Sequence, residues 1–351
     1  MTFDRRLPMI VAMRSPMLPP HLLAWLLPAG IAVAAWRSPV WALLVMVLFQ
    51  IALALLERLP AWQQSPPALP RPRAAYRWVL RLHVLWQAGL LALGVGLAAS
   101  GDHGPAAVVA LGVAIGGVTG SQGITFAHEL GHARTRVDRL LAWLLMGSVL
   151  YGHFMVEHYR GHHARAATRD DPASARRGES LWRFLPRTLA GSLRSAWRLE
   201  ARQLGTLRRG WWRSPLAWAS ALQLTLLVAL GLALGPLALL FWLAQAGHAV
   251  FLLEAINYIE HYGLQRGERD GRREPFGVMH AWNADARLTN RFIANLQRHS
   301  DHHMHAWKPY ETLEALPGPQ LPTGYAGCLF LASVPPLWFG LMNPRLPQPA
   351  A

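Results

Sequence analysis

Nine of the sixteen histidines in this chain lie in four short clusters, and their type and spacing determine what chemistry the sequence could perform. They are His128, His132, His158, His162, His163, His261, His299, His302 and His303. Each cluster adjoins a long apolar run, where imidazole is costly unless it is paired or bound to a metal ion. Nine donors are too many for one ion, so we expect two ions with four or five nitrogens each. Nitrogen-rich sites with an open position suit iron in oxygen chemistry.

The spacing within the clusters indicates which imidazoles face the same way. On a helix, side chains three or four residues apart share a face and can converge on one ion. Such pairs are His128 with His132, His158 with His162, and His299 with His302. His163 and His303 each directly follow another candidate, so each should point elsewhere, toward a second ion, or require a local break in the helix.

Every cluster also contains a carboxylate, and these are Glu129, Glu157, Glu260 and Asp301. Each could accept a hydrogen bond from an imidazole N–H and so orient the ring, or could bind an ion directly. The sequence leaves both roles open. Cys328 is the single cysteine, which excludes an intramolecular disulfide and a thiolate metal centre.

Two other classes of function deserve comparison. Residues 128–132 match the H-E-x-x-H signature of zinc peptidases, in which the glutamate activates a metal-bound water. The seven further clustered histidines count against this class, because a mononuclear zinc site needs only one more protein ligand. A metal transporter would place ligands near mid-membrane on several spans, whereas these clusters gather at the ends of the apolar runs.

The elements that must position the clusters are predicted to be membrane helices. Hydrophobic residues make up 52% of the chain and are bunched into runs that approach or exceed the roughly 17–25 residues of a bilayer-spanning helix. The six runs are 21–36, 39–57, 78–99, 104–127, 215–234 and 236–256. We therefore expect an all-α membrane protein with about six transmembrane helices, forming a single domain over residues 1–351.

Charge gives the expected orientation. The net charge of +15 comes almost wholly from arginine, because Lys308 is the only lysine. Arginines gather before the first run, between the second and third runs, and in the loop 132–214, as in Arg5, Arg6, Arg14, Arg71, Arg73 and Arg77. The positive-inside rule then places both termini and all four clusters on the cytoplasmic side. Nucleic-acid binding would not explain the apolar runs, so we expect no nucleic-acid partner.

Three segments are expected to lie at the membrane interface. The apolar stretch 140–156 is flanked by histidine clusters at both ends, so a full crossing would separate the first two clusters. It should instead lie at the interface or dip into the membrane and return. Residues 181–213 repeat Trp, Leu and Arg at helical spacing and predict an amphipathic helix. The segment 325–342, with Pro335 and Pro336, is predicted to be monotopic.

The order of the clusters resembles the membrane fatty acid desaturase and hydroxylase superfamily, and the longer strings resemble its alkane monooxygenase branch. Residues 128–132 match the first histidine box, 157–163 the second and 296–303 the last. Residues 257–264 match the motif that separates alkane and xylene hydroxylases from ordinary desaturases, and His280 and Asn283 also follow the branch pattern. Ala133 and Arg134 depart from it, because lysine usually follows the first box.

This resemblance implies a non-haem di-iron monooxygenase in which the nine histidines hold two iron ions and His280 and Asn283 join the carboxylates around them. It implies hydroxylation by O2 of the terminal methyl of a medium-chain n-alkane or similar hydrocarbon. Electrons would come from rubredoxin and its NAD(P)H-dependent reductase, with the enzyme surrounded by lipid in a bacterial inner membrane. A fatty acyl desaturase or hydroxylase and a xylene-type aromatic methyl hydroxylase are alternatives within the superfamily.

Overall fold

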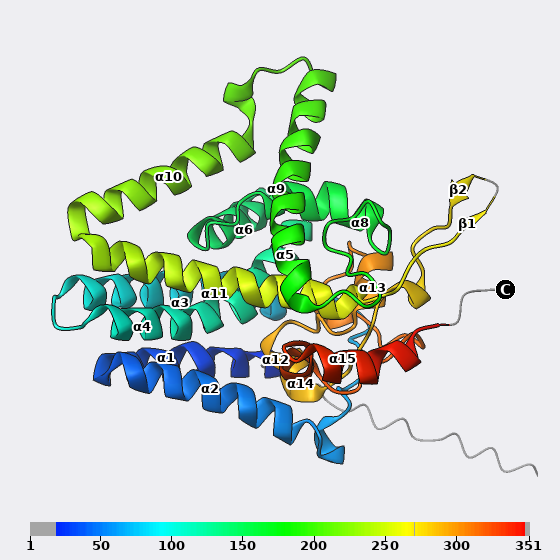
Figure 1. The fold of residues 1–351 in the computed structure, drawn as a ribbon, viewed down its shortest axis with the longest axis horizontal. Helices are drawn as coiled ribbons and strands as arrows, with labels where there is room; N and C mark the ends of the chain where they lie inside the picture. The colour runs from blue at the N-terminus through cyan, green and yellow to red at the C-terminus, as the bar shows by residue number, and fades with distance from the viewer. Residues whose placement is uncertain (1–18, 270, 348–351) are drawn as a thin grey trace, which may run out of the picture.

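The computed structural model describes residues 19–269 and 271–347, and these are mostly helical (Figure 1). A bundle of long helices runs along the molecule, and residues 262–347, here called the C-terminal cap, cover one end of it. The bundle helices are α1 (Leu26–Arg37), α2 (Pro39–Leu56), α3 (Ala74–Ala99), α4 (Pro105–Val118), α5 (Thr125–His132), α10 (Pro215–Leu234) and α11 (Pro236–His261). Arg5, Arg6 and Arg14, which contribute to the expected orientation, lie outside the described residues.

The other α-helices range from three to 26 residues in length, and one small hairpin lies among them. The helices are α6 (Arg136–Ser148), α7 (Phe154–Glu157), α8 (His163–Arg165), α9 (Leu181–Thr206), α12 (Arg287–Phe292), α13 (His299–Met304), α14 (Tyr325–Ala332) and α15 (Pro335–Met342). Strands β1 (Glu268–Arg269) and β2 (Arg272–Arg273) pair antiparallel as a small hairpin that projects from the cap (Figure 1).

Within the described residues, five helices rather than the expected six are long and apolar enough to cross a membrane. They are Pro39–Leu56, Ala74–Ala99, Pro105–His132, Pro215–Leu234 and Pro236–His261. The expected run 21–36 falls short because it opens as a 3-10 helix over Pro20–Trp25, and the α-helix that follows has 12 residues. Two spans end later than expected, because the helices continue through the polar clusters to His132 and His261.

Proline and serine define where several of these helices begin. Proline occupies the first turn of α2, α4, α10 and α11, where its missing N–H leaves no helical bond unmade. The hydroxyls of Ser38 and Ser214 accept hydrogen bonds from the backbone N–H of Val40 and Ala217. Gly235 adopts a φ of 87° between α10 and α11, which a residue with a side chain would adopt only with strain.

A stripe of glycines brings α4 and the following turn close to α11. A Cβ at Gly112 would lie 2.6 Å from the Ala244 Cβ, and one at Gly116 would lie 2.6 Å from the Gln245 carbonyl oxygen. Gly120 continues the stripe four residues later, against Ala249. Small residues at this spacing let helix backbones approach closely. The close packing holds the ends of the two spans together, and these ends carry the first and third histidine clusters.

The segment between the first two clusters reverses direction beside the bundle. Helix α6 packs on α5 and α3, with Arg81 paired to Asp138 at its start and Gln87 donating to the Ser148 hydroxyl at its end. The chain then turns and returns through α7 to His158. Both clusters therefore lie at the same end of the bundle.

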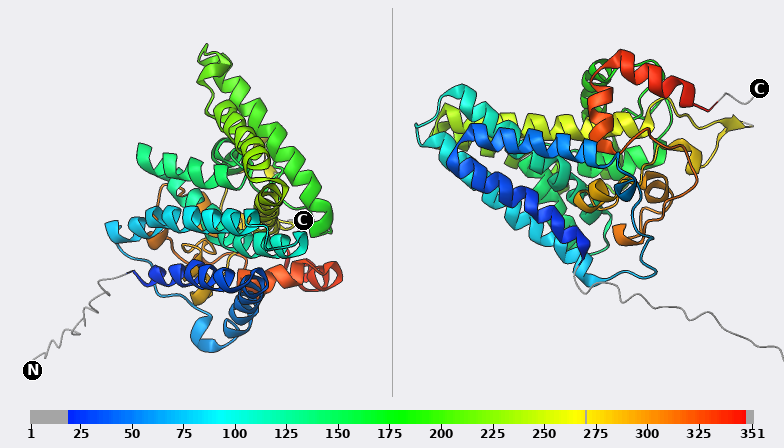
Figure 2. Two further views of the ribbon diagram at one scale, coloured as in Figure 1. Left: turned by 90° about the vertical axis from the view of Figure 1, so that its left-hand side faces the viewer. Right: turned by 90° about the horizontal axis from the view of Figure 1, so that it is seen from below.

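Two further elements cross or leave the bundle. Helix α9 is amphipathic and runs across the direction of the bundle helices, and α10, although it packs on α11, tilts away from the other bundle helices toward the far end of α9 (Figures 1 and 2). The segment 325–342 forms two helices, α14 and α15, that are separated at Ser333 and Val334. Helix α14 packs on both α2 and α11, so the C-terminal cap is attached to two membrane spans.

Candidate metal centre

All nine clustered histidines meet at the capped end of the bundle, where they form two groups. The five-histidine group consists of His128, His132, His158, His163 and His302. The four-histidine group consists of His162, His261, His299 and His303. Within each group, one nitrogen from every ring lies within 4.8 Å of the others. Two ions held by five and four imidazoles fit this arrangement.

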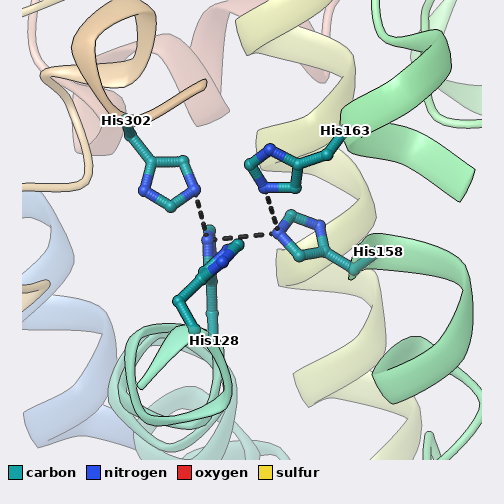
Figure 3. Close-up of side chains that lie close together, drawn as sticks. His128, His158, His163 and His302 are labelled. Carbon is teal, nitrogen blue, oxygen red and sulfur yellow. Dashed lines mark hydrogen bonds between the residues drawn. The ribbon is translucent and has the colours of Figure 1, made fainter. Parts of the chain in front are cut away.

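Four rings of the five-histidine group, those of His128, His158, His163 and His302, direct nitrogens toward one another (Figure 3). The His128 Nε2 lies 2.7 Å from the His302 Nε2 and 3.2 Å from the His158 Nε2. The His163 Nε2 lies 3.0 Å from the His158 Nε2. Metal–nitrogen bonds of about 2.1 Å at right angles put adjacent nitrogens about 3.0 Å apart. These distances are therefore compatible with one ion shared by the rings. The Nε2 atoms of His261 and His299 are 3.2 Å apart, so the four-histidine group could hold an ion in the same way.

The second cluster divides differently from the expectation drawn from its sequence spacing. His158 and His162 were expected to converge on one ion because they are four residues apart, and this is wrong: His158 joins the five-histidine group with His163, and His162 joins the other group. The reason is that residues 158–162 form a π-helical turn, which widens the helix. Side chains five residues apart then share a face, and the intervening His162 points to the second group.

The last cluster departs from expectation for a related reason. His299 and His302 were expected to act together, yet they belong to different groups, and His303 accompanies His299. On an α-helix of 3.6 residues per turn, positions four apart differ by about 40° and positions three apart by about 60° in the opposite sense. In α13, a short helix lying between the two groups, this difference directs His302 to one group and His299 with His303 to the other.

Burial favours the neutral form of five of these imidazoles. Seven of the nine are buried, and His132 and His163 are partly buried. Desolvation, reinforced by the neighbouring histidines, lowers the pKa of His158, His163, His299, His302 and His303 well below the usual value. At neutral pH these rings therefore keep a lone pair available for a metal ion.

Asp171 is a residue of the site that the sequence reasoning missed. Its Oδ2 accepts a hydrogen bond of 2.9 Å from the His162 Nδ1, which leaves the His162 Nε2 free to face the four-histidine group. Burial raises the pKa of Asp171, but the contributions of His162 and Ser174 outweigh it and hold the pKa below its usual value. The acidic pair Asp170–Asp171, shortly after the second box, was the available signal, although a separation of nine residues matches no helical face.

Of the four carboxylates that the sequence singled out, Glu260 contacts the site most directly. Its Oε2 lies 3.3 Å from the His299 Nε2, and its Oε1 accepts a hydrogen bond of 2.7 Å from the Tyr325 hydroxyl. The other three bind elsewhere. Glu129 accepts from the Tyr310 backbone N–H, Glu157 pairs with Arg165, and Asp301 pairs with His305 and Lys308.

His280 and Asn283 lie beside the last cluster in different roles. The Asn283 Oδ1 accepts a hydrogen bond of 2.8 Å from the Ser300 backbone N–H, and the Asn283 Nδ2 donates to the Ser300 hydroxyl. Asn283 thus fixes the first turn of α13. The His280 Nε2 instead contacts Glu274 at 2.8 Å, on the β-hairpin side of the cap.

Two glycines leave room for groups that support the ligand helices. The Tyr159 hydroxyl donates to the His128 carbonyl oxygen at 2.9 Å, and a Cβ at Gly131 would collide with that hydroxyl. A Cβ at Gly161 would lie 2.5 Å from the Arg165 Nη2 and 2.6 Å from the Glu157 carboxylate. These glycines allow the buried side chains to pack directly against the histidine-bearing turns.

An apolar cavity lies between α2, α11, α12, α14 and the turn that follows α4, and its lining residue Tyr325 donates to Glu260, which contacts His299. It is lined by residues that include Phe49, Leu53, Ile124, Leu252, Phe292 and Tyr325. Other lining residues, Thr125, Ile256 and Leu296, lie three to five positions before histidines of the two groups. Phe49 and Phe292 meet edge to face, with ring centroids 4.9 Å apart. A slender apolar molecule in this cavity would lie against residues that are three to five positions from these histidines.

Comparison with known proteins agrees with this arrangement. A sequence model of the fatty acid desaturase family matches residues 104–330. The chain is 44% identical to alkane 1-monooxygenase 1 of Pseudomonas aeruginosa over 239 residues, which covers 67% of this chain and 62% of that protein. It is 39% identical to alkane 1-monooxygenase of Acinetobacter baylyi over 246 residues, or 68% of this chain and 59% of that protein.

A more distant relative has a different named substrate. The chain is 30% identical to the hydroxylase component of xylene/toluene monooxygenase of Pseudomonas putida over 270 residues, covering 74% of this chain and 70% of that protein. The chain spans a little under two thirds of the length of the alkane monooxygenases that it matches.

Proposed function

The chain belongs to the fatty acid desaturase family and is an integral membrane protein, and on this basis we propose that it is a monooxygenase that hydroxylates the terminal methyl of a medium-chain n-alkane or similar hydrocarbon. The observation that carries the proposal is an apolar cavity that Tyr325 and Glu260 connect to two adjoining histidine groups. Relatives named alkane 1-monooxygenase support the substrate class.

The residues present fit two iron ions. The five-histidine and four-histidine groups would each hold one ion through neutral imidazoles, and Asp171 would keep His162 in the tautomer that presents its Nε2. When bound, iron supplies the activation of dioxygen that no side chain of the protein can perform. In the overall reaction, a C–H bond is oxidised, one oxygen atom enters the alcohol, and the other leaves as water after uptake of two electrons and two protons.

The protein's own contribution is to orient the hydrocarbon and to exclude water. An alkane offers no polar group, so the shape of the cavity alone must decide which carbon lies near the ions. One methylene changes binding in an apolar pocket by only about 1–3 kcal/mol, so chain-length selection needs a steric stop. The Phe49–Phe292 pair is well placed to provide one, because both rings line the cavity and contact each other.

Electrons are proposed to come from rubredoxin and its NAD(P)H-dependent reductase, with the metal centre on the cytoplasmic side of a bacterial inner membrane. The arginine-rich loops at the metal end of the bundle support this orientation and would attract an acidic carrier. Such steering weakens as salt is added, because exposed charges are screened over about 8–10 Å at moderate ionic strength.

Two alternatives keep the same oxidant and change the substrate. A fatty acyl desaturase or hydroxylase would need an acyl group at the cavity, and an aromatic methyl hydroxylase is favoured by the likeness to the xylene/toluene enzyme. A zinc peptidase is disfavoured, because a single ion bound through His128 and His132 would leave the four-histidine group without a purpose.

The test is product analysis from the purified, iron-loaded protein supplied with rubredoxin, its reductase and NAD(P)H. Octane should give 1-octanol, and the rate of electron transfer should fall as salt is raised. Exclusive formation of unsaturated acyl products from fatty acyl substrates, with octane untouched, would refute the alkane proposal. A salt-independent rate would refute electrostatic steering of the carrier.

A further inference from the structure

Tyr325 connects the apolar cavity to the metal centre, although it lies outside the four histidine clusters. It is the first residue of α14, its side chain lines the cavity, and it is 2% exposed. Its hydroxyl donates to the Glu260 Oε1 at 2.7 Å and lies 3.4 Å from the Leu296 carbonyl oxygen. Its backbone N–H donates to the Gln297 Oε1 at 3.2 Å. One side of this residue therefore faces the cavity while its hydroxyl is held beside two ligand-bearing segments.

Glu260 extends this connection to the four-histidine group. The carboxylate is 2% exposed, and while its Oε1 is bound by Tyr325, its Oε2 lies 3.3 Å from the His299 Nε2. The Nε2 atoms of His299 and His261 are 3.2 Å apart, so this carboxylate oxygen lies at the edge of the ligand set. Among the described residues, the Tyr325 hydroxyl is the donor that fixes the orientation of the carboxylate. A buried carboxylate that loses its donor must find another partner or move.

We propose that Tyr325 is a positioning residue that couples occupancy of the cavity to the four-histidine metal site through Glu260. A hydrocarbon packed against the Tyr325 ring holds the hydroxyl on Glu260, and the fixed carboxylate sets the surroundings of the ion. The coupling rests on the proposed function only for the choice of a hydrocarbon as occupant. The coupling would link the state of the metal site to the presence of substrate, because an oxidising centre that forms without substrate damages its own ligands.

Because two coupled binding equilibria are thermodynamically linked, this coupling can be measured from binding affinities, without catalysis. If the hydrocarbon and the ion favour the same arrangement, each must tighten the binding of the other by the same factor. Coupling between sites is typically about 5–150-fold. Co²⁺ is a suitable probe, because its visible absorption reports on the ligands around it and it replaces iron at imidazole sites.

The experiment titrates the purified, metal-free full chain in lipid nanodiscs with Co²⁺, with and without octane, and measures octane retention by headspace gas chromatography. In the wild type, octane should shift the Co²⁺ absorption and tighten binding of one of the two ions about fivefold or more. Tyr325→Phe should still bind both ions and retain octane, but should lose the spectral shift and the tightening.

Tyr310→Phe is the matched control. Tyr310 is 1% exposed, and its hydroxyl donates to the Tyr76 carbonyl oxygen at 3.1 Å rather than to a histidine or a carboxylate of either group. This variant loses the same atom from an equally buried ring and should keep the octane response. If Tyr325→Phe does not fold, Glu260→Gln provides the second variant, since it keeps the shape and an acceptor for Tyr325 while replacing the carboxyl group beside His299 with an amide. It should lose most of the octane-induced tightening.

Two results would overturn the coupling. One is a response to octane in Tyr325→Phe, or in Glu260→Gln, equal to that of the wild type. The other is a wild-type Co²⁺ spectrum and affinity that stay unchanged while octane is retained. Failure of the iron-loaded enzyme to form 1-octanol, with the Co²⁺ response intact, would instead count against the proposed function and support the coupling.

Discussion

Replacing Asp171 with asparagine is expected to weaken metal binding at the four-histidine group while leaving the five-histidine group intact. Asp171 contacts only one ligand, His162, through the 2.9 Å bond to its Nδ1. The change keeps the size of the side chain but replaces a charge-assisted hydrogen bond with a neutral one. His162 then loses the partner that orients its ring and raises the basicity of its Nε2.

The magnitude follows from the kind of bond that is lost. Hydrogen bonds to charged groups contribute about 1.5–3 kcal/mol and neutral ones about 0.5–1.5 kcal/mol. Carboxylates that orient a metal-bound histidine typically contribute 10–100-fold in metal affinity, or about 1.4–2.7 kcal/mol. We therefore expect one of the two ions to dissociate from Asp171→Asn at a chelator concentration 10–100-fold lower than in the wild type.

The assay is metal analysis by mass spectrometry after equilibration with a graded chelator. Asp138→Asn is the control, because Asp138, in the first turn of α6, is equally buried but binds Arg81 of α3 and Thr135 instead of a histidine. Its metal retention should match that of the wild type. Equal weakening of both ions in Asp171→Asn, or no weakening, would show that the carboxylate does not support one group selectively.

Other changes test the ligand set, the packing and the cavity. His261→Ala should reduce iron toward one ion per chain and abolish hydroxylation, and full iron content would remove this histidine from the ligands. Gly161→Ala should cost about 1–3 kcal/mol through overpacking and lower the Tm, whereas Gly147→Ala, with no atom within 4 Å of the new Cβ, should not. Phe49→Ala should raise the ratio of dodecanol to octanol at least about tenfold, measured by gas chromatography, and an unchanged ratio would exclude it as a stop. Although burial raises the pKa of Asp138, its arginine and threonine donors outweigh this and lower it below 3.8, so its stabilisation exists above that pH and fades below it. Asp138→Asn should therefore have a lower Tm than the wild type near pH 7, and the difference should close in acid.

The sequence was sufficient to identify the histidines that gather, because residue type and proximity to apolar runs were readable directly. It was not sufficient to assign each histidine to the five-histidine or the four-histidine group. His158 and His162 separate because the backbone takes a π-turn, and His299 and His302 separate because α13 lies between the groups. Neither feature can be recognised from the spacing of the histidines in the sequence. The same spacing is compatible with an unbroken α-helix.

Contacts between segments that are far apart in the chain could not be predicted from the sequence either. Asp171 belongs to no helical repeat with His162, and Tyr325 lies 65 residues from Glu260, so no local pattern connects either pair. The lengths of the spans were misjudged for a different reason. Hydropathy ends where polar residues begin, whereas α11 continues to His261 because its polar end is buried under the C-terminal cap.

Metal ligation joins parts of the polypeptide that are otherwise far apart, since His128 and His302 are separated by 174 residues. A bound ion at such a site acts as a crosslink that the empty chain lacks, and it favours the folded state by mass action. A chain made without metal lacks this crosslink, so it should unfold more readily and be more exposed to proteases. The abundance of the protein, and not merely its turnover of substrate, will consequently follow the supply of metal.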